Sequence, residues 1–165
     1  MKHEWKKTEK SLYLPKNKPE RITVPEFRFF TIKGEGNPND DIFSECIGVL
    51  YSLSYAIKMS PKKGMEPKGY FDYTVYPLEG IWDIKEEAKK KYNGVLNKDD
   101  LAFKIMIRQP DFVDEAYAQE IIKFTQEKKP HRLLDEVKFE KINDGDCVQR
   151  MHIGSYDDEP GRFRK

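Results

Sequence analysis

The sequence predicts an α+β fold in which an antiparallel sheet carries its helices on one face. Several short segments are rich in β-branched and aromatic residues and are bounded by Gly, Pro or Asp-Gly steps, as strands are. Two longer segments have apolar residues at helical spacing, and the first has an apolar face wide enough to lie on a sheet. We expect one domain over residues 21–165, preceded by an N-terminal arm over residues 1–20.

Strands are predicted in four parts of the chain. The first is "ITVPEFRFFTIKGEG" (22–36), which ends in glycines. The second is "YFDYTVYPLEGIWDI" (70–84), with a break at its proline, and the third is its neighbour "LAFKIMIRQ" (101–109). The last part runs over residues 136–153, where the Asp-Gly step of "NDGD" predicts a hairpin between two strands.

Two helices are predicted between these strands. The first lies in residues 39–60, with Asn39 as its N-cap. Phe43, Ile47 and Leu50 form the stripe that we expect to face the sheet. The second helix begins at Asp114 and ends before a proline at position 130.

Composition narrows the classes of function. The 30 Lys and Arg residues balance 29 Asp and Glu residues, for a net charge of +1, which argues against a nucleic-acid partner. The sequence has neither an apolar leader nor an apolar run of membrane-spanning length, so we expect a cytoplasmic protein with no membrane contact. Its two cysteines are expected to be reduced. Three histidines without ligand spacing predict no metal site, and no motif predicts a cofactor.

An internal repeat links the two halves of the chain. "TIKGEGNPND" (31–40) and "MHIGSYDDEP" (151–160) share a strand end, a glycine, turn residues and an acidic helix start. In the first copy this pattern leads into helix, strand and strand. The second copy stops after its helix start, so we expect the chain to lack the C-terminal part of its second unit.

Three segments carry a resemblance to a known family. "YPLEGIW" (76–82), "MIRQPDFV" (106–113) and "VKFEKINDGDCVQRMHIGSYDDEP" (137–160), in this order and with the repeat, resemble the GyrI-like small-molecule-binding family and its stand-alone subfamily. The resemblance covers residues 20–165 and implies two βαββ units related by a pseudo-two-fold axis. It also implies a groove between the units for flat, aromatic, often cationic drugs. The family's last helix and strand, with a further Glu, have no counterpart here.

The resemblance leaves several functions open. Some stand-alone members are similar to enzymes that hydrolyse the cyclopropane ring of DNA-alkylating natural products in an aromatic cage. We therefore expect a hydrolase that protects the cell from such compounds, with an aromatic small molecule as its partner. The alternative is a non-catalytic binder, sensor or sequestering protein. A DNA gyrase inhibitor is a third possibility. The protein is expected to be a monomer or a homodimer.

Glu79 is the candidate catalytic residue, because it is a lone carboxylate within an apolar and aromatic run. Burial would raise its pKa, as a general base or acid requires. A structural role, in which Glu79 caps a turn or pairs with a lysine, is the alternative. Trp82 could line the site or belong to the core. Phe103 and Met106 lie three residues apart on one predicted strand, so their side chains point to opposite faces and only one of them can face the groove. The full set of candidate ligand-binding residues is Tyr51, Tyr55, Tyr73, Tyr76, Trp82, Phe103, Met106, His152 and Tyr156.

Overall fold

The computed structural model describes residues 2–85, 89–90 and 97–151 of the chain. Its main sheet has the strand order β3-β4-β2-β5 and is antiparallel throughout, and β1 and β6 form a separate antiparallel pair. The strands are β1 Glu20–Val24, β2 Phe27–Glu35, β3 Leu78–Ile84, β4 Leu101–Gln109, β5 Lys138–Ile142 and β6 Gly145–Gln149. The helices are α1 Trp5–Thr8, α2 Lys10–Tyr13, α3 Asp41–Lys58 and α5 Glu115–Lys128, with 3₁₀ turns at Ser60–Lys63, Lys98–Asp100 and Arg132–Glu136.

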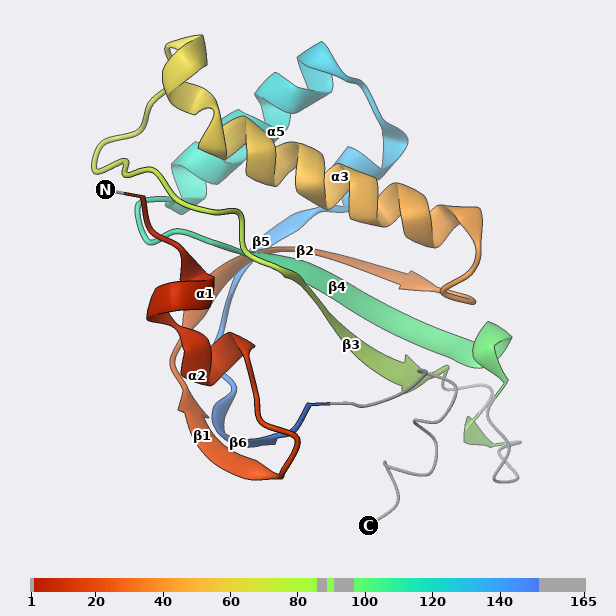
Figure 1. The fold of residues 1–165 in the computed structure, drawn as a ribbon. Coiled ribbons are helices and arrows are strands. Elements are labelled where there is room, and N and C mark those ends of the chain that lie inside the picture. Colours follow the sequence, from red (N-terminus) through yellow and green to blue (C-terminus); the bar gives the residue numbers. More distant parts are fainter. Residues whose placement is uncertain (1, 86–88, 91–96, 152–165) are drawn as a thin grey trace.

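Helices α3 and α5 both cover one face of the main sheet (Figure 1). This confirms the predicted α+β class with helices on one side. The strands β2, β3 and β4 and the helix α3 follow one another as a βαββ unit, as the first copy of the repeat predicts. Most of the second copy falls on residues 152–160, outside the described residues.

Helix α3 packs on the sheet through one wide apolar face. Its N-cap is Asp40, so the predicted cap Asn39 was wrong by one residue. Of the predicted inward stripe, Phe43 and Leu50 are buried, whereas Ile47 is only partly buried. The helix turns by about 100° per residue, which carries the buried stripe around to Cys46 and Leu53 instead of Ile47.

The register of the strands assigns each side chain to one of two faces. Phe30 pairs with Ile107 and Ile32 with Ile105, and all four belong to the core under the helices. We call this side the core face. Alternate residues point the other way, to what we call the open face. Along the strands, the open face carries Phe27, Phe29 and Thr31 of β2, Glu79 and Ile81 of β3, Lys104, Met106 and Arg108 of β4, and Glu140 of β5.

Segment 138–149 is one bent strand, so the predicted hairpin was wrong. β5 pairs with β2 and β6 pairs with β1, and the register that matches Phe27 with Ile142 continues to match Val24 with Gly145. The two long strands therefore run side by side and bend together. Pro25 lies at the bend and has no backbone N–H to donate to the ladder. The Asp-Gly step supplies the bend itself, since Gly145 has a φ of 62°.

The N-terminal arm lies on the domain. Trp5 is buried in the core, and its indole Nε1 donates to the backbone carbonyl of Val75 at 2.9 Å. His3 forms a parallel bridge with Tyr73. In Figure 1 the short helices α1 and α2 stand beside the sheet on the side away from α3 and α5. Within the described residues, none of the helices has the length and apolar character needed to cross a membrane.

Candidate functional site

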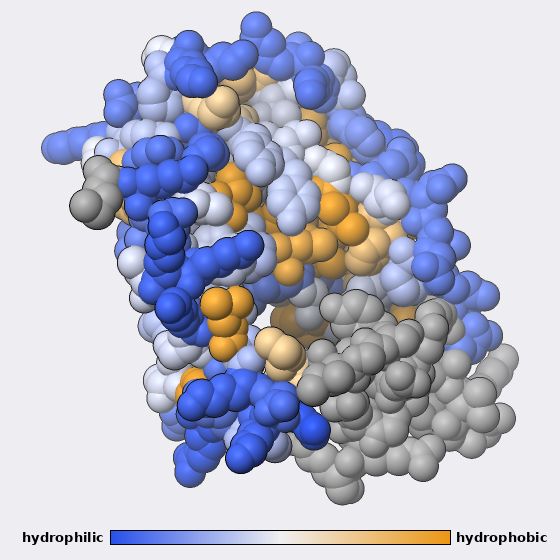
Figure 2. All heavy atoms as spheres, viewed as in Figure 1, coloured by the Kyte–Doolittle hydropathy of each residue, from blue (hydrophilic) through white to orange (hydrophobic). Residues whose placement is uncertain are grey.

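Glu79 lies on the open face of the edge strand β3. Its partner across the strands is Met106 of β4, which is buried but does not belong to the core under the helices. Glu79 therefore projects away from α3 and α5. Figure 2 shows that the molecule is hollowed on this side, below a band of apolar residues.

The environment of Glu79 changes its acidity. Burial raises the pKa of its carboxyl group to about 7, the negative charge of Asp144 acts in the same direction, and the Arg108 guanidinium opposes both. The desolvation is partial, because β3 is an edge strand and Glu79 keeps much of its surface accessible to solvent. A carboxylate that is crowded by protein and still reachable from solvent can exchange protons with a bound molecule near neutral pH.

Arg108 is another charged group on this face. It follows Met106 by two residues on β4, so the two side chains share the open face. The guanidinium lies between two aromatic rings, 3.5 Å from the centroid of Phe27 and 4.3 Å from that of Tyr76. The residue is only 6% exposed, and its Nε has no hydrogen-bond partner among the described residues.

Arg108 also ties the N-terminal arm to the sheet. Its guanidinium donates to the Glu9 carboxylate at 2.7 Å and to the Tyr13 hydroxyl at 3.0 Å. Glu9 lies 2.9 Å from the imidazole Nε2 of His3. Burial works to raise the pKa of Glu9, but the hydrogen bonds from Arg108 and His3 outweigh it and the pKa is lowered. Glu9 is therefore held as the anion that balances the buried guanidinium.

Tyr13 brings the arm into the electrostatic environment of Glu79. Its ring packs 5.1 Å from Trp5 and 6.0 Å from Tyr76, between centroids, and the residue remains partly exposed. Burial raises the pKa of Tyr13 to about 12, against the effect of the Arg108 hydrogen bond, and the charge of Glu79 raises it further. Tyr13 therefore stays protonated at all physiological pH values.

Three solved structures of Listeria innocua proteins are similar to this chain. A hydrolase from Listeria innocua has 35% sequence identity and a TM-score of 0.83, over 96% of this chain and 74% of its own. A second Listeria innocua hydrolase has 36% identity and a TM-score of 0.85, over 96% and 75%. An uncharacterized conserved protein of that organism has 38% identity and a TM-score of 0.82, over the same shares.

The chain belongs to the family of these Listeria innocua proteins. No protein-family model and no curated protein matches the sequence.

The structure brings only part of the predicted site together. Tyr76 lies beside Arg108, and Met106 is the cross-strand neighbour of Glu79. Trp82 and Phe103 pair with each other on the core face, where Trp82 stacks on Phe43 at 5.2 Å and 13°. The expected grouping of Trp82 with Glu79 is corrected accordingly: residues three apart on a strand point to opposite faces.

The remaining predicted residues lie elsewhere. Tyr73 is 1% exposed in the core, and its hydroxyl donates to the carbonyl of Ser54 at 3.4 Å. Tyr51 and Tyr55 lie on α3, which covers the core face, and their ring centroids are 6.4 Å apart. His152 and Tyr156 fall outside the described residues.

Sequence reasoning missed Arg108 and three residues that contact it, namely Phe27, Glu9 and Tyr13. Arg108 could have been predicted from the sequence, because strand alternation places the side chains of Met106 and Arg108 on the same face. Phe27 could have been placed only with the strand register known. Glu9 and Tyr13 belong to an arm without apolar periodicity, and their contacts with Arg108 span 99 and 95 residues of sequence. No local signal predicts such contacts.

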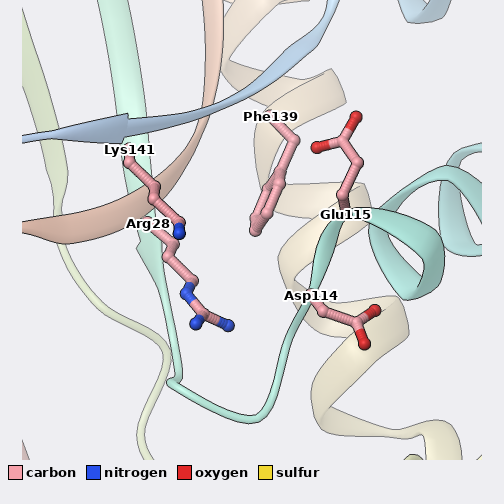
Figure 3. Close-up of a pocket in the computed structure, with 5 residues that line it drawn as sticks. All are labelled: Arg28, Asp114, Glu115, Phe139 and Lys141. Atoms are coloured by element: carbon pink, nitrogen blue, oxygen red, sulfur yellow. The ribbon is translucent and has the colours of Figure 1, made fainter.

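A separate pocket of about 400 Å³ lies at the β5 edge of the sheet (Figure 3). It is lined by Arg28, Asp114, Glu115, Phe139 and Lys141. Arg28 is engaged by the carbonyls of Asp111 and Val113, at 2.9 and 2.5 Å, and Asp114 caps α5 by accepting from the N–H of Tyr117 at 2.8 Å. These groups hold the loop before α5 in place. Among the described residues, no cluster of His, Cys, Asp and Glu side chains could hold a metal ion.

Proposed function

We propose that the protein hydrolyses electrophilic aromatic compounds on its open face, with Glu79 as the general base. One observation carries this proposal: the pKa of Glu79 is raised to about 7 on a face that also carries aromatic rings. A base with a pKa near the working pH is about half ionised and is basic enough to take a proton from water.

A strained cyclopropane is a suitable electrophile for such a site. The ring carbon needs only a water molecule whose proton is being removed, with the ring system held in one orientation. Tyr13, which stays partly exposed beside the buried Tyr76, offers a partly apolar surface on which a flat ring system could rest. The resemblance to GyrI-like proteins favours cyclopropane-bearing DNA-alkylating compounds as the substrates, and detoxification as the role.

The relatives support the chemistry at a coarser level. Two Listeria innocua proteins with more than a third of their residues identical to this chain are hydrolases. Water is therefore a reasonable second substrate for this family. The aromatic nature of the compound and the cyclopropane bond follow from the site and the resemblance, and they remain part of the proposal.

The test is direct. The protein is incubated with a cyclopropane-bearing DNA-alkylating compound, and the reaction is followed by mass spectrometry. We expect a ring-opened product heavier by one water molecule, formed at a rate proportional to protein concentration. Heat-denatured protein controls for spontaneous opening. If the compound raises the melting temperature and no product forms, the protein is a binder and the hydrolase proposal fails.

A further inference from the structure

The strands β1 and β6 form a two-stranded ribbon with an unpaired edge. Among the described residues, β6 pairs only with β1, so its other edge presents backbone N–H and C=O groups that have no strand partner. The ribbon lies at the far end of the molecule from α3 and α5 (Figure 1). Two-stranded ribbons are marginally stable in water, and further strands stabilise them. The outer edge of β6 can therefore accept another strand.

The side chains of β6 do little to protect this edge. Natural edge strands often carry lysines or prolines that prevent pairing with another chain, and β6 has neither. Instead, Val148 in this strand is 64% exposed, and Met151, two residues after its end, is 44% exposed. Apolar side chains along a free edge favour pairing with another strand.

The sequence around β6 is complementary to itself in antiparallel orientation. When two copies pair with Cys147 opposite Cys147, Asp144 of each copy lies opposite Arg150 of the other. Asp146 then lies opposite Val148, and the two Val148 side chains become diagonal neighbours across the symmetry axis. This register joins opposite charges at two equivalent places and covers exposed apolar surface.

The two flanking charges are available for such pairing. Asp144 and Arg150 are both exposed, and neither forms an ion pair among the described residues. Arg150 uses its Nε to donate to the carbonyl of Asn17 at 3.1 Å, which leaves its terminal nitrogens for a carboxylate.

The outer edge of β1 lacks this complementarity. Pairing of two β1 strands about Ile22 would place Arg21 opposite Thr23 and Glu20 opposite Val24. No opposite charges meet in that register. The observations therefore favour β6 over β1.

We propose that a second copy of this chain pairs with β6 in the antiparallel register centred on Cys147. The resulting homodimer has a two-fold axis through its interface and a continuous sheet of strand order β1-β6-β6-β1. The inference concerns assembly and is independent of the hydrolytic function proposed above. Its tests use no substrate, so they succeed or fail separately from that proposal.

The first test measures the mass of the protein in solution over a range of concentrations, by sedimentation or light scattering. Wild type should reach twice the mass of one chain. Val148→Glu places a carboxylate opposite Asp146 of the second copy, so we expect dimer affinity to fall by about tenfold or more. The monomer should tolerate this change, because Val148 is exposed and Arg21 lies opposite it on β1. Val148→Thr is the matched control and should change affinity only a few-fold.

The second test traps the register with a disulfide. Residues directly opposite in an antiparallel pair have Cα atoms about 4.5–5.5 Å apart, which a disulfide can span. Copper phenanthroline with dioxygen removes two protons and two electrons from the thiol pair, and the product is identified by non-reducing electrophoresis and peptide mass spectrometry. Cys46→Ser should keep the cross-link, because Cys46 is 2% exposed, and Cys147→Ser should lose it. Val148→Glu retains Cys147 and should cross-link poorly, which controls for random collision.

The third test exchanges the paired charges. Asp144→Arg alone and Arg150→Asp alone each place like charges opposite each other, so both should weaken the dimer. The variant that carries both changes should recover wild-type affinity within a few-fold. If it does not, the register is wrong.

Two further outcomes would overturn the proposal. Wild type that stays monomeric at every concentration up to its solubility limit would show that β6 does not accept a second copy. A dimer that survives Val148→Glu, or that gives no cross-link through Cys147, would have another interface.

Discussion

Glu79 and Trp82 lie three residues apart on β3 and point to opposite faces of the main sheet. Trp82 stacks on Phe43 of α3 at 5.2 Å, whereas the charge of Glu79 interacts with Arg108 and Asp144 on the other side. The carboxylate therefore does not share a cage with this tryptophan. The aromatic residues that contact Arg108 on that side come from the N-terminal arm, from β2 and from the segment before β3.

Glu79→Gln should separate binding from turnover. The amide keeps the shape of the side chain and removes the proton acceptor, so ligand affinity should stay within a few-fold while kcat falls by roughly 10²–10⁴-fold. Product formation by mass spectrometry and thermal shift with the same compound measure the two effects. Asp83→Asn is the matched control, since it removes a carboxylate from the same strand and face, and it should keep full activity. Unchanged hydrolysis in Glu79→Gln would assign a structural role to this acid.

The pH dependence of the wild type follows from the raised pKa of Glu79. A general base works when deprotonated, so kcat/KM should rise with pH and reach half its plateau at about pH 7. It should fall about tenfold for each pH unit below pH 6. The profile is measured with one substrate in constant ionic strength. A plateau that extends down to pH 5 would contradict the assignment.

Stability should depend on pH through the same group. The folded protein holds a proton on Glu79 up to about pH 7, whereas the ordinary pKa of a Glu side chain is 4.5. Between these two pH values the folded state binds more protons than the unfolded state, so the free energy of unfolding falls as pH rises through this window. Glu79→Gln removes that loss. The free energy of unfolding of both proteins is measured with urea at pH 5 and pH 8. The stability of Glu79→Gln relative to wild type should be greater at pH 8 than at pH 5. An equal difference at the two pH values would contradict the raised pKa.

Trp82→Ala should act on stability and leave ligand binding intact. The indole packs on Phe43 and Phe103 of the core face and is 40% exposed, so we expect the free energy of unfolding to fall by about 1–3 kcal/mol. Chemical denaturation measures this loss. The thermal shift produced by flat aromatic compounds should match that of wild type. A folded Trp82→Ala variant that no longer binds these compounds would show that Trp82 belongs to the ligand-binding site.

The sequence alone determined the local structure, because its signals act over a few residues. A short run rich in apolar residues specifies β4, and the Asp114 cap and Pro130 bound α5. The lone acid in an apolar run marked Glu79 as the residue to examine, and its raised pKa agrees with that choice.

Tertiary structure decided how these elements meet. Asp144–Gly145 has the chemistry of a hairpin turn, and only pairing with β1 and β2 makes it a bend in one long strand. The arm has no periodicity of its own, and it is ordered by the contacts of Arg108 with Glu9 and Tyr13. Contacts between residues almost 100 positions apart depend on strand register and burial, which short-range sequence patterns do not encode.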